Sequence, residues 1–161
     1  MKKSLVILLL VACSLSSNAQ SISLLDLINL TSLNSEQINN YFIAGHTFRL
    51  QYGEEVNGFV VKHYQTNAPA NKLETVLTGA GFKMANGTIL YTASYVTANA
   101  QNILKLVEQT QTANLKKSFQ GADAANNIFI YDNFLYHIVI KLNFDQTQGS
   151  VDVTQKQVFA Q

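Results

Sequence analysis

The sequence predicts an α+β fold, with antiparallel β-hairpins forming one sheet and amphipathic helices packed on one face of it. Three segments repeat their apolar residues every three or four positions, as helices do. Several other segments alternate apolar and polar residues, as half-buried strands do. Turn signals such as Asn86-Gly87 separate neighbouring strand-like segments, which is typical of hairpins.

The first residues have the three parts of a bacterial secretory leader. Met1-Lys2-Lys3 is positive, the eleven residues of 5–15 are mainly apolar, and small polar residues follow. A transmembrane helix needs about 20 apolar residues, so this segment is too short to span a bilayer. Small side chains at Ser17 and Ala19 predict cleavage between Ala19 and Gln20. We therefore expect a signal peptide over 1–19 and a single globular α+β domain over 20–161.

A second interpretation of the leader involves a lipid anchor. The residues Leu10-Val11-Ala12-Cys13 resemble the lipobox of bacterial lipoproteins, in which the cysteine is lipidated and becomes the first mature residue. The apolar run before Cys13 is short and the site at Ala19 is well formed, so we favour ordinary export, to the periplasm or the exterior. Cys13 is the only cysteine. Both interpretations therefore exclude disulfides and cysteine nucleophiles in the mature chain.

Composition limits the classes of partner. Removing 19 of the 161 residues leaves 142, the size of one domain. Loss of Lys2 and Lys3 reduces the Lys and Arg count from 11 to 9, against 10 Asp and Glu, and Arg49 is the only arginine. Phosphate-rich ligands need clustered cationic side chains. We therefore expect no nucleic-acid partner.

The first part of the mature chain predicts two helices followed by a hairpin. The expected helices and strands cover 21–33, 34–45, 47–52 and 59–65. Asn34 and Gln37 have the spacing of a capping box at the start of the second helix, and Gly45 ends it. Residues 53–58 are expected to be a loop.

The middle of the chain predicts three strands and a helix. These elements cover 73–78, 82–85, 88–97 and 98–111. Gly79 and Gly81 are expected to be turn residues, and Asn86-Gly87 a hairpin turn. The helix should direct Ile103 and Leu106 inward.

The last part predicts a polar connection over 112–127 and then strands. The expected strands cover 127–131, 134–144 and 151–159. The first two should be joined by a turn at Asp132-Asn133. Alternation along the second strand places one apolar set on a single face: Phe134, Tyr136, Ile138, Ile140, Leu142 and Phe144.

A weak internal similarity suggests two repeated helix-plus-hairpin units. Four residues of the first helix match four of the later helix in type and spacing: Leu25, Leu27, Ile28 and Thr31 against Leu104, Leu106, Val107 and Thr110. Three further positions match only with gaps: Phe42, Gly45 and Phe48 against Phe119, Gly121 and Ile128. Apolar matches at helical spacing are frequent by chance, so a single non-repeated domain is the alternative.

No known catalytic or metal-binding motif occurs in the sequence. The segment Gly79-Ala80-Gly81 lacks the third glycine and the following helix of a dinucleotide-binding loop. No serine lies in a Gly-x-Ser-x-Gly elbow. His46, His63 and His137 fall on separate predicted elements, without the spacing of a zinc site. We therefore assign no catalytic residue, metal site or cofactor.

We expect an exported, non-catalytic binding or interaction protein of the bacterial envelope or exterior. Aromatic pairs on alternate strand positions belong to the core or line a binding surface: Tyr91 with Tyr95, and Phe129 with Tyr131. One alternative is a carrier of a small apolar ligand, held in a cavity between sheet and helix. Another is an enzyme of unrecognised type, in which two residues of one set would meet in a cleft: His46, His63, His137, Asp123 and Asp132.

Overall fold

The computed structural model describes residues 22–45 and 47–158. The predicted signal peptide, its cleavage site at Ala19 and Gln20, the alternative lipidation site Cys13, and His46 lie outside the described residues.

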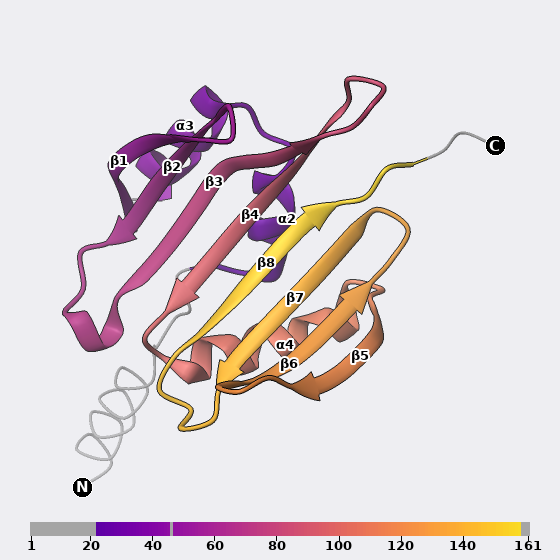
Figure 1. Ribbon diagram of the computed structural model, residues 1–161. Helices are drawn as coiled ribbons and strands as arrows, with labels where there is room; N and C mark the ends of the chain where they lie inside the picture. Colours follow the sequence, from indigo (N-terminus) through magenta and orange to yellow (C-terminus); the bar gives the residue numbers. More distant parts are fainter. Residues whose placement is uncertain (1–21, 46, 159–161) are drawn as a thin grey trace, which may run out of the picture.

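One eight-stranded antiparallel sheet and three α-helices form the described part of the chain (Figure 1). The helices are α2 (Leu24–Leu30), α3 (Ser35–Gly45) and α4 (Ala100–Thr112), and a short 3-10 helix covers Ala70–Lys72. The strands are β1 (Phe48–Val56), β2 (Phe59–Thr66), β3 (Glu74–Lys83), β4 (Ile89–Thr97), β5 (Lys116–Ala122), β6 (Asn126–Asp132), β7 (Tyr136–Asn143) and β8 (Gly149–Gln155). An antiparallel sheet with helices confirms the predicted α+β class.

The order of strands across the sheet is β1-β2-β3-β4-β8-β7-β6-β5. Each group of four consecutive strands is therefore a meander of hairpins, and the last strands of the two groups pair with each other. The pairing of β4 with β8 runs from Thr92 opposite Thr154 to Thr97 opposite Gly149. As a result β4 and β8 lie at the centre of the sheet, and β1 and β5 form its two edges (Figure 1).

Side-chain caps start the helices where the sequence provides Ser or Asn. Ser23 and Asp26 form a reciprocal capping box at α2. At α3 the backbone N–H of Asn34 donates to Gln37 Oε1 (2.9 Å) and the backbone N–H of Gln37 donates to Asn34 Oδ1 (3.0 Å). The predicted capping box at Asn34 is therefore confirmed. Asn99 caps α4 in the same way, through the N–H of Gln101.

The core lies between the helices and alternate residues of the strands. The helices contribute Leu24, Leu27, Leu30, Ile38, Phe42, Ala100, Ile103 and Leu106. The strands contribute Phe48, Tyr64, Val76, Ala93, Tyr95, Tyr131, Ile138, Ile140, Leu142, Val151 and Val153. We call this side of the sheet the back face and the opposite side the front face. Figure 1 shows the front face toward the viewer, with the helices drawn behind the strands.

The first predicted loop is wrong, because β1 continues from Tyr52 to Val56. The turn to β2 consists of Asn57 and Gly58, which have positive φ angles of 53° and 81°. Positive φ at both central positions is the geometry of the tight turn that best suits a hairpin. Gly53, Glu54 and Glu55 lack the alternation of a half-buried strand, and they form a strand because β2 pairs with them.

The predicted turn at Gly79 and Gly81 is also wrong, because both residues lie inside the continuous strand β3. The pairing with β4 shifts between Leu77 and Ala80, which marks a bulge. Gly79 has a φ of 88°, and a Cβ atom there would collide with the carbonyl oxygen of Val60. Its glycine therefore serves a bulge beside a close backbone contact, rather than a turn between two strands.

Strand β5 was not expected, since 112–127 was predicted to be a polar connection. Its residues are almost all exposed, because it is an edge strand with one neighbour. Neither face of β5 is buried, so its sequence lacks the alternation of apolar and polar residues that predicts a strand. The next turn also differs: Asn133 Oδ1 accepts the backbone N–H groups of Leu135 and Tyr136, while Asp132 binds elsewhere.

A buried polar network joins α4 to the centre of the sheet. Tyr95 is fully buried; its hydroxyl donates to Glu74 Oε2 (2.6 Å) and accepts from Asn102 Nδ2 (3.2 Å). Burial, together with the hydrogen bond to the Glu74 carboxylate and its charge, raises the pKa of Tyr95. The hydroxyl therefore stays protonated and continues to donate at neutral pH.

The substitution Tyr95→Phe should lower the free energy of unfolding by about 1–2 kcal/mol, because it removes a buried hydroxyl with two partners. Urea denaturation followed by far-UV circular dichroism would measure the change. Tyr91→Phe is the control, since Tyr91 lies on the same strand and is 38% exposed. Equal stabilities of Tyr95→Phe and the wild type would contradict the role of the network.

Candidate functional site

One row of residues crosses the front face of all eight strands. Each residue lies directly opposite the next in the pairing of neighbouring strands. From β1 to β5 the row is Tyr52, His63, Leu77, Ser94, Asp152, Val139, Ile130 and Phe119. Adjacent strands are about 4.8 Å apart, so the row is roughly 30 Å long.

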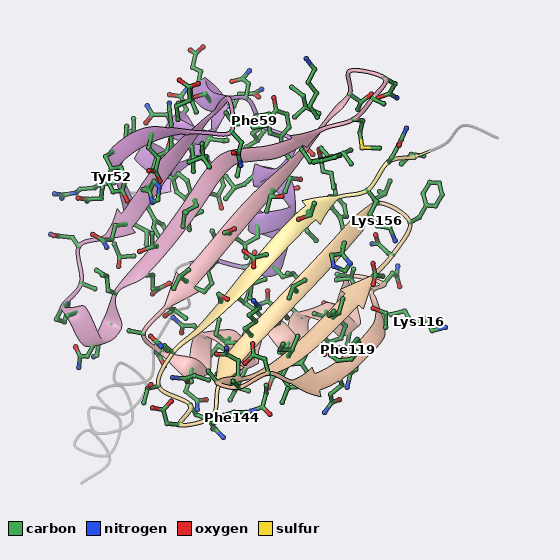
Figure 2. All side chains as sticks on the ribbon, viewed as in Figure 1. Tyr52, Phe59, Lys116, Phe119, Phe144 and Lys156 are labelled. Atoms are coloured by element: carbon green, nitrogen blue, oxygen red, sulfur yellow. The ribbon has the colours of Figure 1, made fainter. Side chains whose placement is uncertain are left out.

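The ends of the row are exposed aromatic residues. Tyr52 is 54% exposed and Phe119 is 48% exposed. They lie at opposite edges of the sheet (Figure 2). Each follows a bulge in its edge strand, between Leu50 and Tyr52 in β1 and between Lys117 and Phe119 in β5. A bulge redirects the side chain that follows it, so both edges present an aromatic ring to solvent in the same local setting.

The centre of the row is polar. Ser94 of β4 lies opposite Asp152 of β8, and on the same face Thr92 and Thr154 are joined by a hydrogen bond of 3.0 Å. Apolar residues separate this centre from the two aromatic ends, with Leu77 on one side and Val139 and Ile130 on the other. The front face is therefore an amphipathic surface, with apolar areas on both sides of a polar centre.

A hydrogen bond between two side chains supports the ring at the β1 end. His63 Nε2 lies 2.8 Å from Glu54 Oε1, and the ring of His63 stacks on that of Tyr52 with centroids 4.2 Å apart. The His63 side chain is only 13% exposed. Tyr52 is consequently held in a defined orientation even though it is exposed.

A second polar cluster surrounds Asp132 near the β5 edge. One carboxylate oxygen, Oδ1, lies 2.9 Å from His137 Nδ1 and 3.3 Å from Lys156 Nζ, and the other accepts the hydroxyl of Ser118. Burial alone would raise the pKa of Asp132, but the hydrogen bonds from Ser118 and His137, the charge of His137 and the contact with Lys156 outweigh it and lower that pKa.

Of the residues proposed for an enzyme that the structure describes, Asp132 and His137 meet, whereas His63 and Asp123 do not join them. His63 belongs to the β1–β2 cluster, and Asp123 binds the backbone N–H groups of Ala125 and Asn126 within its own turn. These backbone bonds lower the pKa of Asp123. Asp132 lies between Ser118 and His137 and takes a hydrogen bond from each. A serine nucleophile needs the histidine beside it as a base, so this arrangement does not activate Ser118.

Several open grooves flank the sheet. One has a volume of about 510 Å³ and lies between the α2–α3 connection and the strands β2, β3 and β4. Another, of about 360 Å³, lies between α3 and β1. Neither is lined by Asp132 or His137.

Tyr64 lies at the groove between α3 and β1 and has an unusual hydroxyl group. The residue is 1% exposed, and its Oη atom is the one buried side-chain polar atom of the described residues without a hydrogen-bond partner. Burial raises the pKa of Tyr64, so the hydroxyl keeps its proton at neutral pH. Its ring packs against Phe42, with centroids 4.4 Å apart.

Within 22–45 and 47–158, no three His, Cys, Asp or Glu residues are grouped so that they could hold a metal ion. In the same part of the chain, no helix is long and apolar enough to cross a membrane.

Comparison with known proteins adds no family assignment. No protein-family model, curated protein or solved structure matches the chain.

The residues that mark these surfaces were not predicted from the sequence. Tyr52 was placed at the end of a strand and Phe119 in a polar connection, so their common position was hidden. The signal that was available is the aromatic residue that precedes a glycine by one or two positions in each edge strand, at Gly53 and Gly121. The unpaired hydroxyl of Tyr64 depends on packing and has no sequence signal.

The substitution Asp132→Asn should make the free energy of unfolding decrease less as the pH is lowered into the acid range. The pKa of Asp132 in the folded protein lies below its ordinary value of 3.8, so its stabilising contribution is present above that value and is lost as pH falls through the lower folded pKa. Asp132→Asn should therefore decrease the free energy of unfolding at pH 7 by about 1 kcal/mol and reduce its decline below pH 4. Urea denaturation from pH 2 to 7 would measure both effects.

Ser118→Ala is the matched variant for this prediction, because it removes one of the hydrogen bonds to Asp132 and keeps the carboxylate. It should give a pH profile between those of the wild type and Asp132→Asn. Superimposable profiles of Asp132→Asn and the wild type would show that the cluster does not hold the carboxylate.

The substitution Tyr64→Phe should raise the free energy of unfolding by up to about 1 kcal/mol. The unfolded chain hydrates the hydroxyl, whereas the folded protein leaves it without a partner, so its removal spares a desolvation cost. The sign is opposite to that expected for Tyr95→Phe, in which a paired hydroxyl is lost. A decrease as large as that of Tyr95→Phe would mean that the Tyr64 hydroxyl is satisfied in the folded protein.

Proposed function

We propose that this chain is an exported, non-catalytic binding protein of the bacterial envelope or exterior, and that the front face of its sheet docks a partner protein. The observation that carries the proposal is the row from Tyr52 to Phe119, with exposed aromatic residues at both ends and a polar centre. Export rests on the leader-like residues of 1–19, which have the charge and apolar pattern of a signal peptide.

We infer further that the helices pack on the back face alone and leave the front face uncovered. The contacts support this inference, because α2 lies against β4, α4 against β4, β7 and β8, and α3 against β1. The strand residues in the core with these helices alternate with those of the front row. A sheet face with no covering layer and with exposed aromatic residues is typical of an interaction surface.

The sheet is best explained as two units related by a pseudo-twofold axis through the pair Ser94 and Asp152. Rotation about this axis superposes one half of the front row on the other, so that Tyr52 corresponds to Phe119 and Leu77 to Val139. The neighbouring pairs exchange too, since Tyr95 lies opposite Val151 while Ala93 lies opposite Val153. The bulges of β1 and β5 fall at corresponding positions.

The helices α2 and α4 support the same relationship. Thr31 Oγ1 donates to the Ile28 carbonyl (2.8 Å), and Thr110 Oγ1 donates to the Val107 carbonyl (2.7 Å). Each threonine is 1% exposed and lies four residues after a fully buried leucine: Leu27 and Leu106. These are positions matched in the sequence, so we infer a repeated helix-plus-sheet unit in which α3 is an insertion. The gapped matches beyond the helices do not fit this relationship, because it makes Phe119 equivalent to Tyr52, whereas the sequence match aligns Phe119 with Phe42.

The size of the front row favours a protein partner over a small molecule. Its aromatic ends lie roughly 30 Å apart, which a partner can bridge only with an extended surface. Protein interfaces of standard size bury about 800 Å² on each partner and are enriched in aromatic residues at their core. Two equivalent aromatic ends would provide two anchors for the same partner.

The two alternatives receive less support. A carrier of an apolar ligand needs a cavity between sheet and helix, where the structure has a packed core and grooves open to solvent. An enzyme would need a cleft around Asp132 and His137, which line none of the described grooves and have no activated nucleophile beside them.

Site-specific photo-crosslinking in the native host would test the proposal. A benzophenone amino acid placed at Tyr52 or Phe119 should give the same discrete adduct, since both rings contact one partner. The control position is Leu25, which is 64% exposed on α2. The double variant Tyr52→Ser with a benzophenone at Phe119 should lose most of the adduct, because one of two anchors is missing.

Two results would contradict the front face as the docking surface. The first is an adduct of equal yield from Leu25. The second is the absence of any adduct from both aromatic positions in cells that express the protein at its natural level.

A further inference from the structure

Strand β1 is an open edge of the sheet and the more apolar of its two edges. All of its residues after Phe48 are exposed, and it pairs with β2 alone (Figure 1). The exposed large apolar side chains of β1 are Leu50, Tyr52 and Val56, and that of β5 is Phe119. An edge strand of this kind offers unpaired backbone N–H and C=O groups to another strand.

The other edge strand carries a protection that β1 lacks. Strand β5 begins with Lys116 and Lys117, and lysine side chains on an edge strand hinder its pairing with another chain. The sequence of β1 contains no lysine. Both edge strands have a bulge, so the bulge does not distinguish them. The edge that is open to a further strand is therefore β1.

The charged side chains of β1 are arranged so that the strand complements itself. Arg49, Tyr52 and Glu54 lie opposite every second residue of β2, from Gln65 to Val61, so all three share the front face. Arg49 and Glu54 are therefore equally far from Tyr52 in the register, on opposite sides of it. A twofold axis perpendicular to the sheet, beside Tyr52, would place Arg49 of each copy opposite Glu54 of the other.

Both charged groups can take a partner from outside the chain. Arg49 is exposed and takes part in none of the ion pairs found among the described residues. The side chain of Glu54 is 49% exposed and uses Oε1 for its contact with His63. Its second oxygen can accept further hydrogen bonds, and guanidinium groups bind carboxylates more strongly than neutral donors do.

The back of the same edge has apolar side chains that a second copy would cover. Ile43 of α3 and Leu50 of β1 line one groove and are 58% and 47% exposed. The same twofold axis would bring Leu50 opposite Gly53 of the other copy, where no side chain obstructs it. The α3 helices of both copies would lie near the axis, because α3 packs against β1.

We propose that this chain forms a twofold-symmetric homodimer, in which β1 pairs antiparallel with β1 of a second copy and the two sheets become one. Two ion pairs between Arg49 and Glu54 of opposite copies fix the register. Twofold dimers are the commonest closed assemblies and use the same surface on both copies. Strand side chains stand perpendicular to the sheet, so Tyr52 stays on the front face. The dimer therefore does not depend on the protein-docking function.

Sedimentation velocity on the protein purified from its host, over a roughly hundredfold range of concentration, tests the proposal. The wild type should change from monomer to dimer as its concentration rises. Arg49→Glu and Glu54→Arg should each weaken dimerisation by about tenfold or more, because both ion pairs become like-charge pairs. An equimolar mixture of the two variants should dimerise again, because each contact then joins an acidic and a basic side chain.

Lys117→Glu is the matched control, since it reverses a charge on the other edge strand and should leave dimerisation unchanged. Arg49 and Glu54 are both exposed, so the circular dichroism spectra of the single variants should match that of the wild type. Hydrogen exchange gives a second measurement. Amides of β1 should exchange more slowly in the dimer than in dilute, monomeric protein, and amides of β5 should exchange equally in both.

Three results would overturn the proposal: a wild type that stays monomeric at every concentration, single variants that dimerise like the wild type, or a mixture that does not recover the dimer. A loss of dimer in Lys117→Glu as large as that in Arg49→Glu would also overturn it, because β5 would then form part of the contact.

Discussion

The pairing of β4 with β8 is the constraint on which the rest of the structure depends. Each of the two four-strand meanders has two edges, and this pairing removes one edge from each and creates a single sheet. It also brings Tyr95 beside Val151 in the core, where α4 contacts β4, β7 and β8 together. Tyr95 extends this connection through Glu74 and Asn102 to the start of α4. Without the central pairing, neither meander would have a complete back face for its helix.

The same pairing also aligns the residues of the front face. Side chains alternate along each strand, so one set faces the core and the other faces the front. The strand order and register that assemble the core therefore also align the front row. Because β4 and β8 lie at the centre, β1 and β5 become the two edges, and each edge presents an exposed aromatic ring after its bulge, Tyr52 in β1 and Phe119 in β5.

The sequence predicted what depends on local pattern and missed what depends on neighbours. Alternation along β7 correctly placed Ile138, Ile140 and Leu142 in the core, and the capping box at Asn34 and Gln37 formed as expected. Strand β5 has no buried face, so only its pairing with β6 reveals it. Gly79 looked like a turn residue because a bulge and a turn both need positive φ. The front row and the unpaired Tyr64 hydroxyl arise from strand order and packing, which no local pattern encodes. For this reason the proposed docking surface could not be located from the sequence.

Native-state hydrogen exchange is the most direct test of the claim that one continuous sheet organises the protein. If the pairing of β4 with β8 unites the two meanders, the backbone amides of these strands should exchange most slowly, at the rate of global unfolding, and amides of β1 and β5 should exchange faster through local opening. All protected amides of β2, β3, β6 and β7 should then converge on the same global free energy as denaturant is added. Exchange of the central amides as fast as that of the edges, with the two meanders reaching separate free energies, would contradict the claim and show two independent units.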